Sequence, residues 1–328
     1  MGLQDLSAAK RPSRRLSDGM RSPMGQVFAR RFPPAAKRHN FMRLNLEKIR
    51  EAEVNPNKTE IDNPAELTQT LKDLTLQMGA NVVGVAEFNS NLTFADKEQL
   101  DHKYVIVFGI SMAYDVMADI SPASQDEVHL VYYSMDDIGL RLANQIGAYG
   151  YSARMQPNGG DFPLPAYGQL SGIGELGKHG SLISPELGSS FRLCAVSTDM
   201  PLVADGPRDH GIDEICTNCK VCQRFCPGEA IRPQKQVKNG ILRWHIDTPA
   251  CQPYFYQLYG CKLCLMVCPF NGRGHMKERF KPMAKTIRDA KDAAGMLRII
   301  QDRNHLDFEE FADVLPEGVP SVKEKYGL

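Results

Sequence analysis

Hydrophobic positions in the first third of the chain predict one helix followed by two strands. Leucine and methionine recur at helical spacing over residues 64–78, with Asn63 as the N-cap and Pro64 at the first helical position. Continuous apolar runs follow over residues 81–86 and 104–110. Their length and their β-branched residues are typical of buried strands.

The same alternation of helix and strand continues along the chain. Apolar residues at helical spacing, beginning with Leu130 and Tyr133, predict a second helix over about residues 125–147. Short apolar segments over residues 151–155 and 192–197 predict two further strands. Together these elements predict an α/β core.

Charge is balanced overall but uneven along the sequence. The 328 residues include 39 Lys and Arg and 39 Asp and Glu, yet residues 1–50 hold twelve basic and three acidic residues, a net charge of +9. This segment is rich in Pro, Ser and Arg and has little periodicity. We therefore expect a solvated, partly disordered extension along the body of the protein. An arm that binds nucleic acid is the alternative.

Neither export nor membrane insertion is expected from the sequence. The adjacent arginines at residues 14–15 and 30–31 are not followed by the apolar segment of a twin-arginine signal. No apolar stretch approaches the length of a transmembrane helix. We expect a cytoplasmic protein with no membrane partner.

Eight of the nine cysteines form two runs with related spacing, C-x2-C-x2-C-x3-C-P and C-x9-C-x2-C-x3-C-P. Four thiolates hold one cubane [4Fe–4S] cluster, and in bacterial dicluster ferredoxins the fourth cysteine of a run ligates the other cluster. The spacing predicts two ligand sets: Cys216, Cys219, Cys222 and Cys268 for the first cluster, and Cys226, Cys251, Cys261 and Cys264 for the second.

Other uses of these cysteines explain the pattern less well. A zinc ribbon has no need of eight cysteines in two such runs, and disulfide frameworks belong to small secreted chains. Two clusters without crossed ligands stay open as an alternative. The ninth residue, Cys194, lies in an apolar segment and is expected to be a buried structural thiol.

Residues 156–188 are rich in glycine and are expected to form a long loop. Residues 172–177 contain three glycines, but no strand closely precedes them, as a dinucleotide-binding motif requires. We therefore expect no nicotinamide site. Glycine allows the backbone to approach a ligand closely, which would suit a flat macrocycle held by backbone groups.

The segment over residues 172–188, the motif Phe191-Arg-Leu and the motif Ser197-Thr-Asp-Met-Pro-Leu resemble those of cobalamin-dependent reductive dehalogenases. Epoxyqueuosine reductases carry a related version, and both families share the isolated Cys251 ahead of the second run. The resemblance covers about residues 64–275.

This resemblance implies an α+β fold in which a nitroreductase-like, corrinoid-binding α/β core carries an appended bacterial-type dicluster [4Fe–4S] ferredoxin domain. The domains expected are a basic extension over residues 1–60, the corrinoid-binding catalytic domain over 61–208, the ferredoxin-like domain over 209–280 and a helical tail over 281–328.

The resemblance also implies base-off cobalamin, which agrees with the absence of a D-x-H-x-x-G motif. Electrons would pass from the outer cluster to the inner one and then to cobalt, giving Co(I). The residues expected to bind this cofactor are Gly159, Gly160, Gly172, Gly174, Gly177, Lys178, His179, Gly180 and Ser181.

For catalysis, the resemblance implies a tyrosine as proton donor, at Tyr132 or Tyr133. Adjacent residues on a helix diverge by about 100°, so only one of the two can face the cofactor. Arg192 in the Phe-Arg-Leu motif would favour the phenolate and so ease proton release. Asn158 stands where epoxyqueuosine reductases have an aspartate, and an asparagine cannot act as a general acid.

The expected activity is reductive removal of a halogen from an organohalide, or reduction of another small molecule. An external ferredoxin, flavodoxin or reductase would supply the electrons, and nucleic acid is not expected as a partner. One alternative is an epoxyqueuosine reductase that modifies tRNA. Another is an electron-transfer protein with no active site of its own.

Overall fold

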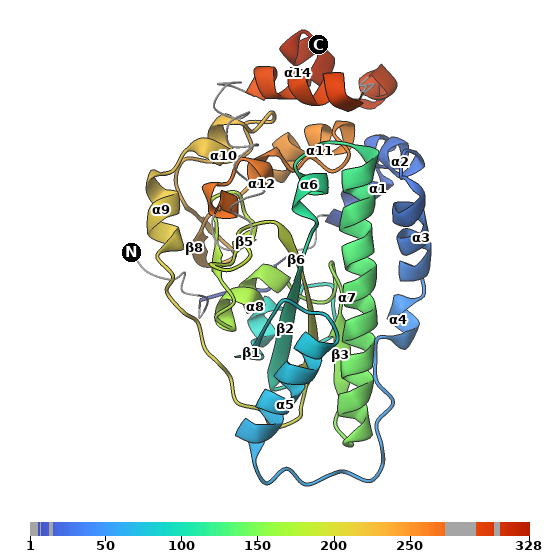
Figure 1. Ribbon diagram of the computed structural model, residues 1–328, viewed down its shortest axis with the longest axis vertical. Coiled ribbons are helices and arrows are strands. Elements are labelled where there is room, and N and C mark those ends of the chain that lie inside the picture. Colours follow the sequence, from blue (N-terminus) through green and yellow to red (C-terminus); the bar gives the residue numbers. More distant parts are fainter. Residues whose placement is uncertain (1–5, 7, 13–15, 273–292, 305–308) are drawn as a thin grey trace.

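The computed structural model of the chain describes residues 6, 8–12, 16–272, 293–304 and 309–328 (Figure 1). Its centre is a four-stranded sheet in which every neighbouring pair of strands is antiparallel. The spatial order is β1 (Val82–Glu87), β2 (Tyr104–Ser111), β6 (Phe191–Thr198) and β3 (Ala153–Gln156).

The two central strands are buried on both faces, and successive side chains enter different cores, as the period of two in a strand requires. Ile106 and Phe108 of β2 point with Val196 of β6 into one core, whereas Val105 and Val107 point into the other. All four strands expected from the apolar runs are present within two residues of their expected ends.

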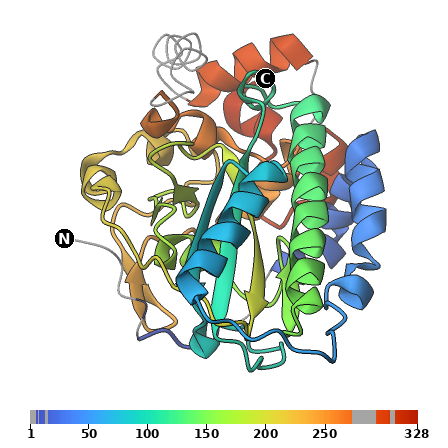
Figure 2. The same ribbon diagram turned by 60° about the horizontal axis from the view of Figure 1, so that its bottom comes forward.

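Two helices cover one face of the sheet, α5 (Pro64–Gln77) and α7 (Pro122–Ala148), and Figure 2 shows them side by side. Helix α5 begins as expected, because the Asn63 side chain accepts a hydrogen bond from the backbone N–H of Glu66. Helix α7 begins earlier than expected. Its N-cap is Ser121, which forms a capping box with Ser124.

The face that α7 presents to the sheet also differs from expectation. Leu130 and Tyr133 are 50% and 45% exposed, although their spacing suggested a place in the core. Val131 and Met135 point inward instead, into the same core as Ile138, Leu142 and Ile146 further along the helix. Over the first half of α7, the residues that face the sheet are therefore not the ones expected from the sequence.

The glycine-rich segment is not a simple loop. It contains a helix that covers the second face of the sheet, together with a two-stranded hairpin. These elements are α8 (Leu164–Leu170), β4 (Glu175–Leu176) and β5 (Leu182–Ile183). Gly174 lies in this hairpin, where an added Cβ would come within 2.1 Å of the Ile183 carbonyl oxygen. Close packing of the chain on itself therefore requires this glycine.

The expectation of a solvated N-terminal extension is wrong for the described residues from 16 to 49, which form helices. These are α1 (Leu16–Arg21), α2 (Pro23–Arg30), α3 (Pro34–Arg43) and α4 (Leu46–Ile49). Helix α3 runs beside α7 (Figure 1), and its Ala36 N–H donates to the Asp126 carboxylate at 2.9 Å. Phe28 of α2 packs against Tyr256, with 5.2 Å between ring centres. The i, i+3, i+4 spacing of Met24, Val27 and Phe28 was the signal for this buried face.

The eight cysteines of the two runs lie in or between short elements at one end of the sheet, where α10, α11 and α12 gather in Figure 1. These elements are α9 (Ile212–Asn218), α10 (Val221–Arg224), β7 (Gln236–Lys238), β8 (Ile241–Arg243), α11 (Thr248–Gln257), α12 (Leu263–Met266) and η2 (Pro269–Gly272). The remaining described elements are η1 (Ser90–Leu92), α6 (Tyr114–Met117), α14 (Ala293–Asn304), η4 (Glu309–Val314) and α15 (Val322–Tyr326). No helix in the described ranges combines the length and the hydropathy needed to cross a bilayer.

Candidate iron–sulfur and catalytic site

The structure gathers the eight cysteines of the two runs around two cavities. One cavity is lined by Cys216, Cys219, Cys222 and Cys268. The second is lined by Cys226, Cys251, Cys261 and Cys264. Each cavity thus takes one cysteine from the other run, which is the grouping expected from the spacing. We call these the first and the second cysteine cavity.

Burial makes thiolates at these positions unfavourable without a nearby positive charge. It raises the pKa of Cys216 and Cys251 to about 11 and that of Cys222 and Cys261 to about 12. Within the described residues, no three His, Cys, Asp or Glu side chains are arranged to hold a single ion. The donor set fits a group of several iron atoms, which would both fill each cavity and supply the charge that keeps the thiols deprotonated.

Two residues expected to bind the corrinoid lie at these cavities. Lys178 is 2% exposed, and its Nζ donates to the carbonyl oxygens of Cys219 at 2.9 Å and Thr217 at 3.3 Å. It also lies 4.8 Å from the ring centre of Trp244. His179 is 5% exposed and lines both cavities. Its Nδ1 accepts a hydrogen bond from the backbone N–H of Ser181.

Several of the other glycines expected to bind the corrinoid are required by the backbone conformation or by packing within the fold. Gly172 and Gly180 have φ of +73° and +77°, which disfavours any other residue. Gly177 packs on Ile183, where an added Cβ would lie 2.5 Å from its Cδ1. These contacts explain the glycines without a ligand.

Tyr132 and Arg192 come together, whereas Tyr133 points away. The Arg192 guanidinium carbon lies 5.7 Å from the ring centre of the partly buried Tyr132. Tyr133 on the next position of α7 is 45% exposed. The Nε of Arg192 is buried and has no hydrogen-bond partner among the described residues. Of the two tyrosines, Tyr132 is therefore the one beside the arginine.

Lys262 follows Cys261 of the second cysteine cavity and bonds to α7, the helix that carries Tyr132. It is 2% exposed, and its Nζ donates to Ser124 Oγ at 2.7 Å and to the Tyr259 carbonyl oxygen at 3.3 Å. Burial lowers the pKa of Lys262 to about 7, opposed by Cys261 and assisted by the positive charge of Arg192. Nothing in the sequence distinguished this lysine from the surface lysines around it.

A row of buried polar side chains beside Tyr132 was also not predicted from the sequence. His39 Nε2 lies 3.0 Å from Asp136 Oδ2, and His39 Nδ1 lies 3.0 Å from Nδ1 of His129. The row ends at Gln125, whose amide nitrogen is 3.2 Å from His129 Nε2. Burial, with smaller contributions from His39 and nearby arginines, lowers the pKa of His129 to about 3, so this ring stays neutral. The His39 ring stacks on Tyr132 with 5.8 Å between centres, which links α3 to the tyrosine.

Asn158 lies in a turn with Gly159 and Gly160, and its side chain is exposed. Its carbonyl oxygen accepts a hydrogen bond from the Arg43 guanidinium of α3. Among the described contacts, none joins the Asn158 side chain to Tyr132 or Arg192. The structure therefore brings two of the expected catalytic residues together and leaves Asn158 apart from them.

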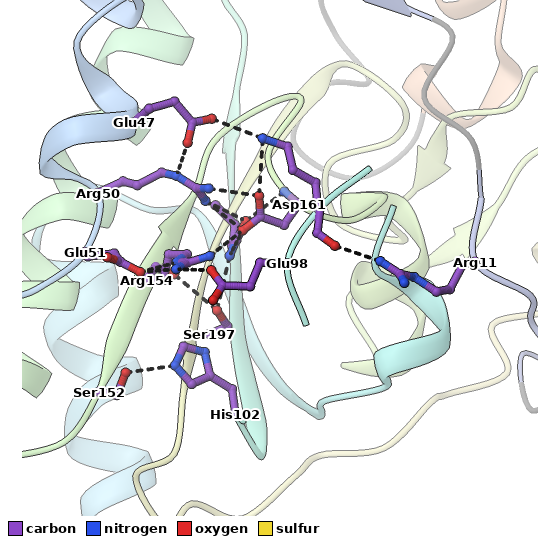
Figure 3. Close-up of polar contacts among 12 residues, drawn as sticks. Arg11, Glu47, Arg50, Glu51, Glu98, His102, Ser152, Arg154, Asp161 and Ser197 are labelled. Carbon is purple, nitrogen blue, oxygen red and sulfur yellow. Dashed lines mark hydrogen bonds and ion pairs between the residues drawn. The ribbon is translucent and has the colours of Figure 1, made fainter. Parts of the chain in front are cut away.

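A buried ion-pair network fixes the turn that carries Asn158 (Figure 3). Asp161 is 1% exposed and binds Arg50 through both oxygens, at 2.8 and 2.9 Å. The Gln156 amide donates to the same carboxylate at 3.2 Å, while its oxygen accepts the Asp161 N–H at 2.9 Å. Arg154 joins the network and binds Glu51 at its exposed side. Arg50 belongs to the segment that the sequence placed in a loose extension.

Comparisons with known proteins agree with this site. Residues 215–272 match the family model described as 4Fe-4S dicluster domain, which confirms an iron–sulfur module. The α+β fold predicted from the sequence is confirmed as well. The solved structure described as "Reductive dehalogenase structure suggests a mechanism for B12-dependent dehalogenation" has a TM-score of 0.74 at 23% identity, covering 92% of this chain and 48% of that one.

Curated relatives cover the same region at higher identity. The tetrachloroethene reductive dehalogenase of Sulfurospirillum multivorans is 30% identical in an alignment of 255 residues that covers 63% of this chain and 51% of the relative. The epoxyqueuosine reductase of Lactococcus garvieae is 27% identical over 154 residues, 45% of this chain and 42% of the relative. The chain spans about half the length of the first of these. It is thus homologous to tetrachloroethene reductive dehalogenases and is similar, at lower identity, to an epoxyqueuosine reductase.

Proposed function

We propose that the chain is a corrinoid iron–sulfur oxidoreductase that removes halogen from an organohalide reductively. The observation that carries this proposal is the contact between Tyr132 and Arg192, together with Lys262, which follows Cys261 and bonds to Ser124 on the helix of Tyr132. Relatives named tetrachloroethene and trichloroethene reductive dehalogenases support the substrate class. So does a fold neighbour whose structure was solved with 3-bromo-4-hydroxybenzoic acid.

Two [4Fe–4S] clusters would be held by the first and the second cysteine cavity, with crossed ligands, and would supply one-electron transfer. The second cavity would be the inner one, because Lys262, which follows Cys261 of that cavity, bonds to Ser124 on the helix that carries Tyr132. A separate ferredoxin, flavodoxin or reductase would provide the electrons. A cytoplasmic location suits a protein that depends on eight reduced thiols.

Base-off cobalamin would supply a strongly reducing metal centre next to Tyr132. Two buried polar atoms there, Arg192 Nε and Gln125 Oε1, lack partners among the described residues and fit the amide groups of a corrin ring. Gly159 and Gly160 stay candidates for the same ligand, as do Gly172, Gly174, Gly177, Gly180 and Ser181.

The reaction would consume two electrons and one proton, break the carbon–halogen bond, form a carbon–hydrogen bond and release halide. Tyr132 would hold the proton at its Oη and transfer it to the carbon that loses the halogen. The positive charge of Arg192 would stabilise the phenolate that is left. Arg192 would therefore favour proton release without giving up a proton of its own.

The geometry around Asn158 favours this reaction over epoxyqueuosine reduction. Position 158 has no carboxyl group, and the nearest acid in the turn, Asp161, is buried and bound to Arg50. Burial acts to raise the pKa of Asp161, but the hydrogen bonds and charge of Arg50 outweigh it and lower the pKa. This carboxylate cannot hold a proton for catalysis near neutral pH.

The test is turnover of the cobalamin-loaded protein on halogenated phenols and alkenes under a strong reductant without oxygen. Tyr132→Phe should lose about 100- to 10,000-fold in rate, the usual contribution of general acid catalysis. Tyr133→Phe is the matched control and should turn over like the wild type. Equal rates for the two variants would remove Tyr132 from the mechanism, and no halide release from any substrate would remove the proposed activity.

A further inference from the structure

His179 occupies the turn between β4 and β5, at the boundary between the two cysteine cavities. It lines both of them, and its side chain is buried. Cys268 lines the first cavity together with His179, and Cys264 lines the second with it. Whatever fills either cavity will therefore lie against His179.

One backbone contact fixes the tautomer of His179. The N–H of Ser181 donates to His179 Nδ1 at 3.2 Å, so Nδ1 must be the unprotonated nitrogen. An imidazole ring with one unprotonated nitrogen is neutral. The single ring proton is therefore on Nε2.

The Nε2–H group has no partner among the described residues, although the atom is buried. A buried donor left unpaired costs about 1–3 kcal/mol, and such donors in native proteins nearly always have an acceptor. The acceptors that iron–sulfur clusters offer in such cavities are the sulfur atoms of the cluster and of its cysteines.

We propose that His179 donates a hydrogen bond from Nε2 to an iron–sulfur cluster at the boundary of the two cavities, and so sets the difference in reduction potential between the clusters. The inference rests on the iron–sulfur part of the proposed function. It gives His179 a place with the clusters, in contrast to the corrinoid-binding role that the resemblance implies. A hydrogen bond to sulfur stabilises the reduced, more negative cluster, so the bonded cluster is easier to reduce.

Lys178 next to His179 acts in the same direction by a different means. Its buried ammonium group lies beside the first cavity and bonds to the Cys219 carbonyl oxygen. The charge favours the thiolate form of Cys216 and Cys222. Lys178 therefore favours reduction at the first cavity, whereas His179 alone contacts both.

The experiment is an anaerobic redox titration of the reconstituted full chain, followed by EPR, on wild type, His179→Phe and His179→Gln. His179→Phe keeps the ring volume and loses the donor, so at least one midpoint should become more negative. His179→Gln restores an N–H donor and should recover part of the shift. His102→Phe is the control, because His102 bonds Ser152 and lines neither cavity.

A second measurement keeps the test valid if His179→Phe loses iron. Pulsed ENDOR of the reduced wild type should show an exchangeable proton coupled to a cluster, and this coupling should be lost in heavy water. Unchanged midpoints in a fully loaded His179→Phe, or no such proton in the wild type, would overturn the proposal. Neither readout needs cobalamin or substrate, so failure of dehalogenation leaves this test intact.

Discussion

Replacing Asp161 by asparagine should loosen the turn that carries Asn158 while leaving the sheet in place. Asp161 and Arg50 are 1% and 5% exposed and share two hydrogen bonds. Removing one partner of a buried pair costs about 3–5 kcal/mol, because the other charge stays buried without compensation. The lower end applies here, since Glu47 still binds Arg50 at 2.9 Å and the asparagine oxygen can accept one N–H. About 3 kcal/mol corresponds to roughly 100-fold.

Hydrogen exchange of the backbone amides measures this loss locally, without assuming that the whole chain unfolds in one step. The N–H groups of Gly160 and residue 161, which bond within the turn, should exchange roughly 100-fold faster in Asp161→Asn. Amides of β2 should keep their protection. Asn158 in the same turn should lose its fixed position.

Glu51→Gln provides the matched control for this substitution. Glu51 binds Arg154 in the same network, but its side chain is 61% exposed, and exposed pairs contribute only about 0–1 kcal/mol. Exchange in this variant should rise less than about fivefold. Equal effects of Asp161→Asn and Glu51→Gln would refute the argument that burial makes the Asp161 pair important.

The pH dependence of the same turn follows from the lowered pKa of Asp161. The stability that Asp161 contributes is fully present above its unfolded pKa of about 3.9 and is lost as the pH falls through its folded pKa. Protection of the turn amides, corrected for intrinsic exchange, should therefore be constant above about pH 5 and decline in acid. Cys226→Ala should alter the EPR spectrum of the cluster in the second cavity, although Cys226 belongs to the first run of cysteines. Cys268→Ala should alter the spectrum of the cluster in the first cavity. If each substitution instead altered the other cluster, that result would contradict the crossed ligation. Ser121→Ala removes the cap of α7 and should lower stability by about 1 kcal/mol, seen as a lower midpoint of thermal unfolding.

Local signals in the sequence predicted the elements that depend on local rules. The cap at Asn63 placed the start of α5, and the apolar runs placed β1 and β2. Spacing alone also anticipated which cysteines share a cavity, because crossed ligation is built into the repeated run.

Features that depend on how distant elements meet could not be read from the sequence. The choice between Tyr132 and Tyr133 depends on which face of α7 meets the sheet, and apolar residues on both faces obscured it. Arg50 and Asp161 are 111 positions apart and carry no local pattern. The two halves of the buried row at His39 are 90 or more positions apart for the same reason.

Helix α2 meets part of its packing surface only after residues far along the chain have been made. Phe28 and Val27 of α2 are buried in a cluster that includes Phe311, about 280 residues later. At a synthesis rate of about 5–20 residues per second, that interval is roughly 15–60 s. During this interval the apolar face of α2 lacks part of the surface that covers it in the folded protein. That face is thus completed late in synthesis, and the delay makes the nascent chain a natural client for chaperones.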